Sequence, residues 1–127
     1  MATKSKDVIA SDVLMAINDK DRGKIDPLTT DDVQMRFPPG QLFTGRDGLS
    51  AFFDELERRL PELTVVGQSV YSGDDYVVVE YEGKGRTAGS RDIETMGCLV
   101  LQTDGDRVRR ATLYVDTAQW REIEQGA

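Results

Sequence analysis

The second half of the chain constrains the fold most, because it contains four strand-like segments joined by short connections. The segments cover residues 63–71, 76–86, 93–103 and 107–115. The turn Ser72-Gly73-Asp74-Asp75 joins the first two, and the loop Asp104-Gly105-Asp106 joins the last two. Connections this short predict an antiparallel meander rather than βαβ units. Gly83, Gly85 and Gly97 lie in or beside these strands and predict a strongly curved sheet.

Helices are predicted upstream of the meander. Ile9, Val13 and Ile17 recur on one helical face and predict a helix over residues 7–19, and a short helix or turn follows over residues 21–27. Thr44 and Asp47 fit a capping box at the start of a longer helix, which Pro61 ends. This helix is predicted from one apolar stripe, formed by Leu49, Phe52, Phe53, Leu56 and Leu60.

One further strand and the overall class complete the predicted fold. Residues 33–37 alternate apolar and polar side chains, which predicts a half-buried strand ended by Pro38-Pro39-Gly40. Residues 116–124 are expected to form a final helical turn. The length of 127 residues suits a single domain over 1–127. The fold class is α+β, with a mostly antiparallel curved sheet around the helices and an internal pocket on its concave face.

The residue inventory excludes several kinds of chemistry. The chain has no His and a single Cys, Cys98, so it holds no Ser-His-Asp triad, no Cys-His pair and no His-ligated zinc. The loop aspartates lack the spacing of an EF-hand, and no glycine-rich loop opens a helix after a strand. We therefore expect neither a metal site nor a cofactor, and any chemistry must use carboxylates, Tyr, Arg or Lys.

Charge and hydropathy limit the kinds of partner that the chain is expected to bind. The 16 Lys and Arg face 23 Asp and Glu, a net charge of −7, which argues against nucleic acid and anionic membranes as partners. No apolar run approaches the roughly 20 residues of a membrane-spanning helix. The first residues lack the apolar stretch of a secretory signal, so we expect a cytoplasmic location.

Four segments carry a resemblance to a known family. Residues 31–38 (DDVQMRFP) resemble a first-strand pattern DDVxxxxP, and residues 45–53 (GRDGLSAFF) are similar to a helix start G-R-(D/E)-x-(I/L)-x-x-F-(F/W). Residues 83–89 (GKGRTAG) fall where the family often has G-T-H-x-G, and residues 104–116, from DGDRV to YVD, resemble D-G-K-I…(Y/W)-x-D. On these motifs the chain resembles the NTF2-like superfamily. Its SnoaL-like polyketide cyclase branch, which is related to ketosteroid isomerases, is the most similar.

The resemblance implies a cone-shaped fold and one candidate acid/base. It puts Asp116 where SnoaL-like cyclases carry an acid/base aspartate; the other interpretation is that Asp116 only caps the final turn. By strict alternation Val108, Arg110, Thr112, Tyr114 and Asp116 share one face of the last strand. Tyr114 is therefore a candidate donor to a substrate oxygen or enolate. The chain departs from the family where its frequent His is replaced within 83–89.

Five further residues are candidates for binding the substrate. Arg36 is expected to hold an anionic group if its strand face turns inward, although a solvated position is favoured. Phe53 lies on the helix under the concave face. Tyr81 shares a face with Val77 and Val79, and the sequence leaves open whether that face lines the pocket. Glu94 is a candidate near the mouth of the pocket; the alternative is a charge on the surface of its strand. Trp120 is a candidate at the floor of the pocket; the alternative is packing in the core.

Three functions follow from these candidates. The first is cofactor-independent acid/base chemistry, of the cyclase or isomerase kind, on a small apolar carbonyl compound. The second is a non-catalytic module that binds a small apolar or aromatic ligand or mediates dimerisation. The third is an epoxide hydrolase, which needs a second inward carboxylate beside Asp116. By fold-level analogy we also expect a homodimer through the outer face of the sheet.

Overall fold

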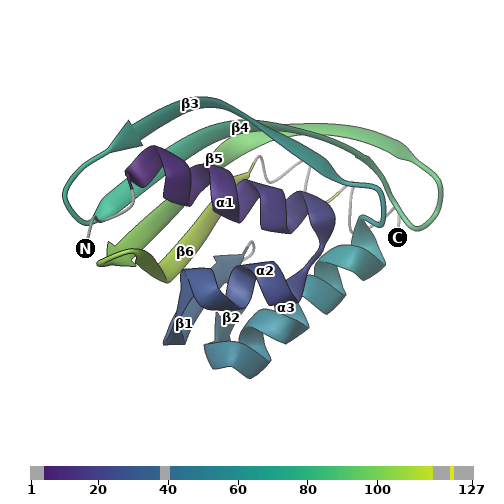
Figure 1. Cartoon of the computed structure of the whole chain (residues 1–127). Helices are drawn as coiled ribbons and strands as arrows, with labels where there is room; N and C mark the ends of the chain where they lie inside the picture. Colours follow the sequence, from purple (N-terminus) through teal and green to yellow (C-terminus); the bar gives the residue numbers. More distant parts are fainter. Residues whose placement is uncertain (1–4, 38–40, 116–120, 122–127) are drawn as a thin grey trace.

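The computed structural model describes residues 5–37, 41–115 and 121, and it shows helices under one curved sheet (Figure 1). The predicted α+β class is confirmed. The helices and strands are α1 (Lys6–Asp19), α2 (Arg22–Ile25), the 3₁₀ turn η1 (Asp26–Leu28), β1 (Thr29–Phe37), β2 (Gln41–Thr44), α3 (Gly45–Arg59), β3 (Thr64–Ser72), β4 (Tyr76–Arg86), β5 (Asp92–Asp104) and β6 (Arg107–Val115).

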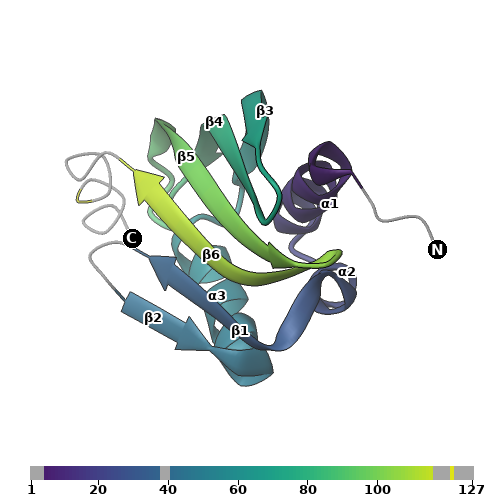
Figure 2. The same cartoon turned by 90° about the vertical axis from the view of Figure 1, so that its left-hand side faces the viewer.

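The six strands are ordered β2-β1-β6-β5-β4-β3, as Figure 2 shows from the outer face. The predicted meander of β3, β4, β5 and β6 is confirmed, with antiparallel pairing throughout. β1 pairs in parallel with β6, a contact between distant segments that local patterns do not report. β1 also begins four residues earlier than predicted, because Thr29 already pairs with Val108.

The chain enters α3 differently from the prediction. β2 pairs antiparallel with β1 and was not predicted, because four residues after Pro38-Pro39-Gly40 are too short to show a pattern. The capping box was wrong: Thr44 occupies the N-cap but its side chain makes no capping hydrogen bond. Gly45 follows at φ +72°, a left-handed turn that carries the chain directly from strand into helix.

The helices pack on the inner face of the sheet. α1 contacts β3 and β4, whereas α3 contacts β1 and β2 (Figure 1). The predicted apolar stripe of α3 is buried, with Leu49, Phe52, Phe53 and Leu56 all at most 6% exposed. In the part of the chain that the structure describes, no helix is long and apolar enough to cross a membrane.

Candidate functional site

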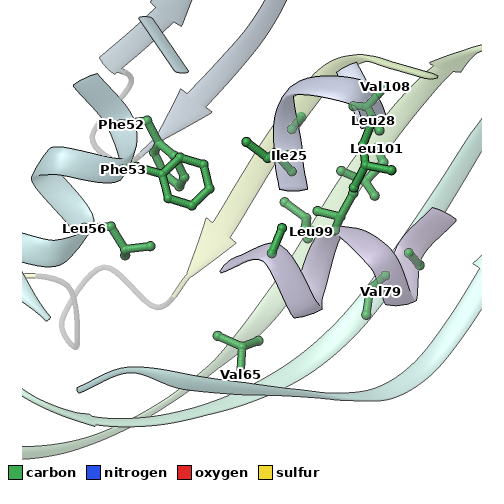
Figure 3. Packing of buried hydrophobic residues seen from close by; sticks show 14 of the residues in the cluster. Ile25, Leu28, Phe52, Phe53, Leu56, Val65, Val79, Leu99, Leu101 and Val108 are labelled. Carbon is green, nitrogen blue, oxygen red and sulfur yellow. The ribbon is translucent and has the colours of Figure 1, made fainter. Parts of the chain in front are cut away.

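A cavity of about 80 Å³ lies between the helices and the inner face of the sheet. Its walls are almost entirely apolar. Phe52, Phe53 and Leu56 of α3 face it from one side and Leu99 of β5 from the other, and Figure 3 shows these side chains converging. The cavity lies on the concave face, where the sequence leads us to expect a pocket, and it is small because the two phenylalanines and the leucines fill most of that face.

The alternation along β4 identifies the face that lines the cavity. Val77, Val79 and Tyr81 are buried, at 0%, 0% and 6% exposure, whereas Glu80 and Glu82 are exposed. The sequence did not decide which face of β4 lines the cavity. The structure shows that it is the face that carries Tyr81.

Tyr81 is a polar side chain in this apolar wall. Burial raises the pKa of its phenol, and the neighbouring Cys98 thiol raises it further. The hydroxyl lies close to the backbone of Gly97, its register partner on β5; a Cβ added there would be 3.0 Å from it. The phenol therefore stays neutral at physiological pH and keeps its hydroxyl proton.

The predicted face of β6 was wrong, because a bulge at Arg109 interrupts the alternation. Gln102 pairs with Arg110 while Thr103 pairs with Val108, so Arg109 is an extra residue. Val108 faces the core, but beyond the bulge the inner face passes to residues 111, 113 and 115. Tyr114 consequently lies on the outer face, 57% exposed, and is not part of the cavity wall.

The other candidates are scattered. Phe53 lines the cavity and is 2% exposed. Arg36 contributes to the wall, yet the residue is exposed. Glu94 is on the surface, where one carboxylate oxygen lies 3.8 Å from the ammonium of Lys84. Asp116 and Trp120 lie outside the described residues, so their roles stay predictions.

Polar groups in the wall are few. The hydroxyl of Thr29 donates to the carbonyl of Asp26 at 3.1 Å, and Thr95 and Tyr81 supply the remaining side-chain hydroxyls of the wall. No described lining residue is Asp or Glu. Over residues 5–37, 41–115 and 121, no cluster of three potential metal ligands occurs. Thr95 and the packing role of Gly97 were missed by sequence reasoning, since both depend on cross-strand register.

Comparisons with known proteins agree with this architecture. A family model described as a SnoaL-like domain matches residues 10–111. No curated protein matches the sequence.

Three solved structures illustrate the likeness. An NTF2-like protein of unknown function from Burkholderia pseudomallei has a TM-score of 0.86 at 16% identity, covering 94% of this chain and 98% of that one. A Jannaschia sp. CCS1 protein that carries the designation SnoaL-like polyketide cyclase gives 0.81 at 17%, covering 97% and 96%. A Catenulispora acidiphila protein with a ketosteroid isomerase-like fold, in complex with trimethylamine, gives 0.82 at 17%, covering 91% and 90%. Together they confirm the resemblance and the fold.

Proposed function

The chain belongs to the SnoaL-like domain family, and from that premise we propose that it is a cofactor-independent acid/base enzyme of the cyclase or isomerase kind. Its substrate is a small apolar carbonyl compound bound in the cavity. The observation that carries the proposal is a buried, neutral phenol, that of Tyr81, in a wall that is almost entirely apolar. A structural neighbour in complex with a compact molecule, trimethylamine, supports a small ligand.

Tyr81 binds the carbonyl oxygen. Its hydroxyl donates a hydrogen bond that strengthens as negative charge develops on that oxygen, which stabilises an enolate more than the ketone. The raised pKa keeps the proton on the phenol, so Tyr81 acts as a donor and not as a base. This role was assigned to Tyr114 by alternation; Tyr81 takes it because Tyr114 is exposed on the opposite face.

Asp116 is the proposed acid/base. In the sequence it falls where SnoaL-like cyclases carry an acid/base aspartate, and the proposal requires its carboxylate to reach the cavity. Its carboxylate removes a proton from the carbon next to the carbonyl, the electron pair moves onto the oxygen held by Tyr81, and the proton returns to the same or another carbon. A carboxyl group can perform both steps, first as the base and then as the acid.

Exchange of α-protons in D₂O tests the proposal without knowledge of the natural substrate. Wild-type protein should accelerate deuterium incorporation into butanone, measured by NMR. Asp116→Asn should lower that rate by roughly two to four orders of magnitude, as removal of a general acid/base does. Tyr81→Phe should lower it, and the exposed Tyr71→Phe should not. Equal rates in wild type and Asp116→Asn would contradict the proposal.

A non-catalytic binding module is the second candidate. It is favoured by the absence of Asp and Glu among the described residues of the cavity wall. In that case butanone binds, but its exchange rate equals the rate in buffer. The same absence counts against an epoxide hydrolase, which requires two converging carboxylates.

We also propose that the chain forms a homodimer through the outer face of its sheet. Met96 is 61% exposed there and Tyr114 57%, between the exposed acidic Glu80 and Glu82 of β4 and the exposed basic Arg36 of β1. A two-fold axis near the middle of the sheet brings the acidic side of one copy to the basic side of the other.

Sedimentation equilibrium tests the dimer. The association constant should fall with added salt, and Met96→Glu should reduce it. Met15→Glu is the matched control, because Met15 is 54% exposed on α1, away from the sheet face. A monomer at all salt concentrations would refute this interface.

A further inference from the structure

The cavity is too small for an aromatic ring. An apolar cavity of about 150 Å³ binds benzene, and the cavity between α3 and the sheet has about half that volume, about 80 Å³. The cavity volume therefore limits the size of the part of the ligand that it encloses. This limit excludes the aromatic rings that would otherwise be expected in a ligand for this fold.

Two phenylalanines of α3 keep the cavity narrow. The rings of Phe52 and Phe53 meet edge to face with centroids 5.3 Å apart, and both side chains are at most 4% exposed. The ring of Phe43 on β2 packs edge to face against the ring of Phe52, with centroids 6.0 Å apart and an interplanar angle of 70°. Figure 3 shows Phe52 and Phe53 side by side, opposite Leu99 and Ile25. Widening the cavity therefore requires loss of a ring contact, which opposes adaptation to a larger ligand.

The chemistry of the wall sets the other property of the ligand. Of the residues that the structure describes there, the only one with a charged side chain is Arg36, which is exposed. A charged group on the ligand would lose its hydration without a buried counter-charge, so the enclosed part must be neutral. The phenol of Tyr81 supplies one donor, which one carbonyl oxygen satisfies.

From this volume, the braced rings and the single phenol, we infer that the cavity selects a compact, neutral aliphatic ketone or aldehyde and rejects aromatic ketones. The inference rests on the proposed function for the carbonyl group, and the size limit comes from the cavity alone. Phe53 is the residue with which to test the limit, because its ring forms part of the wall.

The test is an NMR titration of the full chain with butanone and with acetophenone. A ligand as small as butanone binds weakly, so the titration runs to millimolar concentration. In the wild type the dissociation constant for acetophenone should exceed that for butanone by at least about tenfold, the discrimination that one misfitting group produces in an apolar pocket.

Two variants with the same chemical change test whether Phe53 limits the size of the ligand. Phe53→Leu should remove most of the discrimination by admitting acetophenone. Phe43→Leu removes the same volume from a buried ring that does not line the cavity. Because it acts only through its contact with Phe52, it should relax the discrimination less than Phe53→Leu does. Thermal melts of both variants check that they fold. If Phe53→Leu does not fold, Leu99→Val enlarges the opposite wall and should relax the discrimination in the same direction.

Each outcome bears on one proposal or the other. Wild-type protein that binds acetophenone as tightly as butanone overturns the size selection, even if it exchanges α-protons. Selective binding of butanone without α-proton exchange supports the size selection and overturns the proposed enzyme. Failure to bind either ketone overturns the inference that the cavity takes a carbonyl compound.

Discussion

The hydroxyl of Tyr81 on β4 lies over Gly97 on β5, so close that a Cβ on residue 97 would be 3.0 Å from the hydroxyl oxygen. The same Cβ would overlap the carbonyl oxygen of Tyr114 on β6. Gly97 therefore allows the two neighbouring strands to approach, and it leaves room for the phenol that the proposed function requires.

Gly97→Ala should destabilise the fold by about 3 kcal/mol, the upper end of the usual cost of overpacking, since the obstacle is rigid backbone. Gly105→Ala is the control: nothing lies near its Cβ, but its φ of +61° strains an alanine, at about 1 kcal/mol. Urea denaturation should rank Gly97→Ala as the more harmful. The reverse ranking would mean that β5 and β6 separate at little cost.

Tyr81 should make stability fall at high pH. Its pKa in the folded chain is raised by burial and then by Cys98, above the unfolded value of about 10. A group with a raised folded pKa stabilises fully below its unfolded pKa, and that contribution is lost as pH rises above 10. The free energy of unfolding should therefore drop by up to about 1.4 kcal/mol per pH unit from this group.

Urea denaturation between pH 9 and about 11 measures this slope. Because the pKa of Cys98 is also raised by partial burial, the series is made in a Cys98→Ala background. Tyr81→Phe should flatten the slope, whereas Tyr71→Phe should leave it unchanged, since Tyr71 is 56% exposed. An unchanged slope in Tyr81→Phe would contradict the assignment of the pH dependence to the Tyr81 phenol.

Asn18 should protect the edge of the sheet. Its amide nitrogen donates to the carbonyl of Val65 at 2.9 Å, and its oxygen accepts from the Val65 amide at 2.7 Å. β3 is an edge strand, so both backbone groups lose a partner in Asn18→Ala. We expect a loss of about 1–3 kcal/mol and faster hydrogen exchange at Val65. Gln68→Ala, an exposed change on the same strand, should do neither.

Replacing Arg46 by lysine should destabilise the fold. Its guanidinium donates to the carbonyl of Asp26 at 2.5 Å, to the carbonyl of Thr29 at 3.2 Å and to the carboxylate of Asp31 at 3.1 Å. A lysine ammonium cannot reproduce this fork, so Arg46→Lys should cost about 1–2 kcal/mol. Arg58→Lys, at a surface pair with Glu55, should cost under about 0.5 kcal/mol. Equal costs in thermal denaturation would contradict a clamp at Arg46.

Local patterns in the sequence were sufficient to predict most helices and strands, but not which face of each strand is buried. The stripe from Leu49 to Leu60 predicts α3 because burial on one side repeats every three or four residues. The motif at residues 45–47 (GRD) has roles that the sequence did not predict. Gly45 turns the chain, and Arg46 forms hydrogen bonds with η1 and β1, whereas the side chain of Thr44 makes no capping hydrogen bond. Neither role is visible until the partners from β1 are in place.

The site was harder to predict because it depends on register. One inserted residue, Arg109, moves Tyr114 from the predicted inner face to the outer face. The choice between the two faces of β4 likewise depends on which side α1 and α3 cover, a tertiary contact. Tyr81 was a candidate from its sequence position, but its importance comes from Gly97, sixteen residues later in the chain and on another strand.

The central claim is that the Tyr81 hydroxyl holds a ligand carbonyl inside the cavity. Infrared difference spectroscopy of bound butanone, with its carbonyl carbon labelled with ¹³C, tests this directly, because a hydrogen bond lowers the carbonyl stretching frequency. Wild-type protein should shift the band to lower frequency relative to the ketone in an apolar solvent, and Tyr81→Phe should abolish the shift while butanone still binds. An identical band in both proteins would contradict the account.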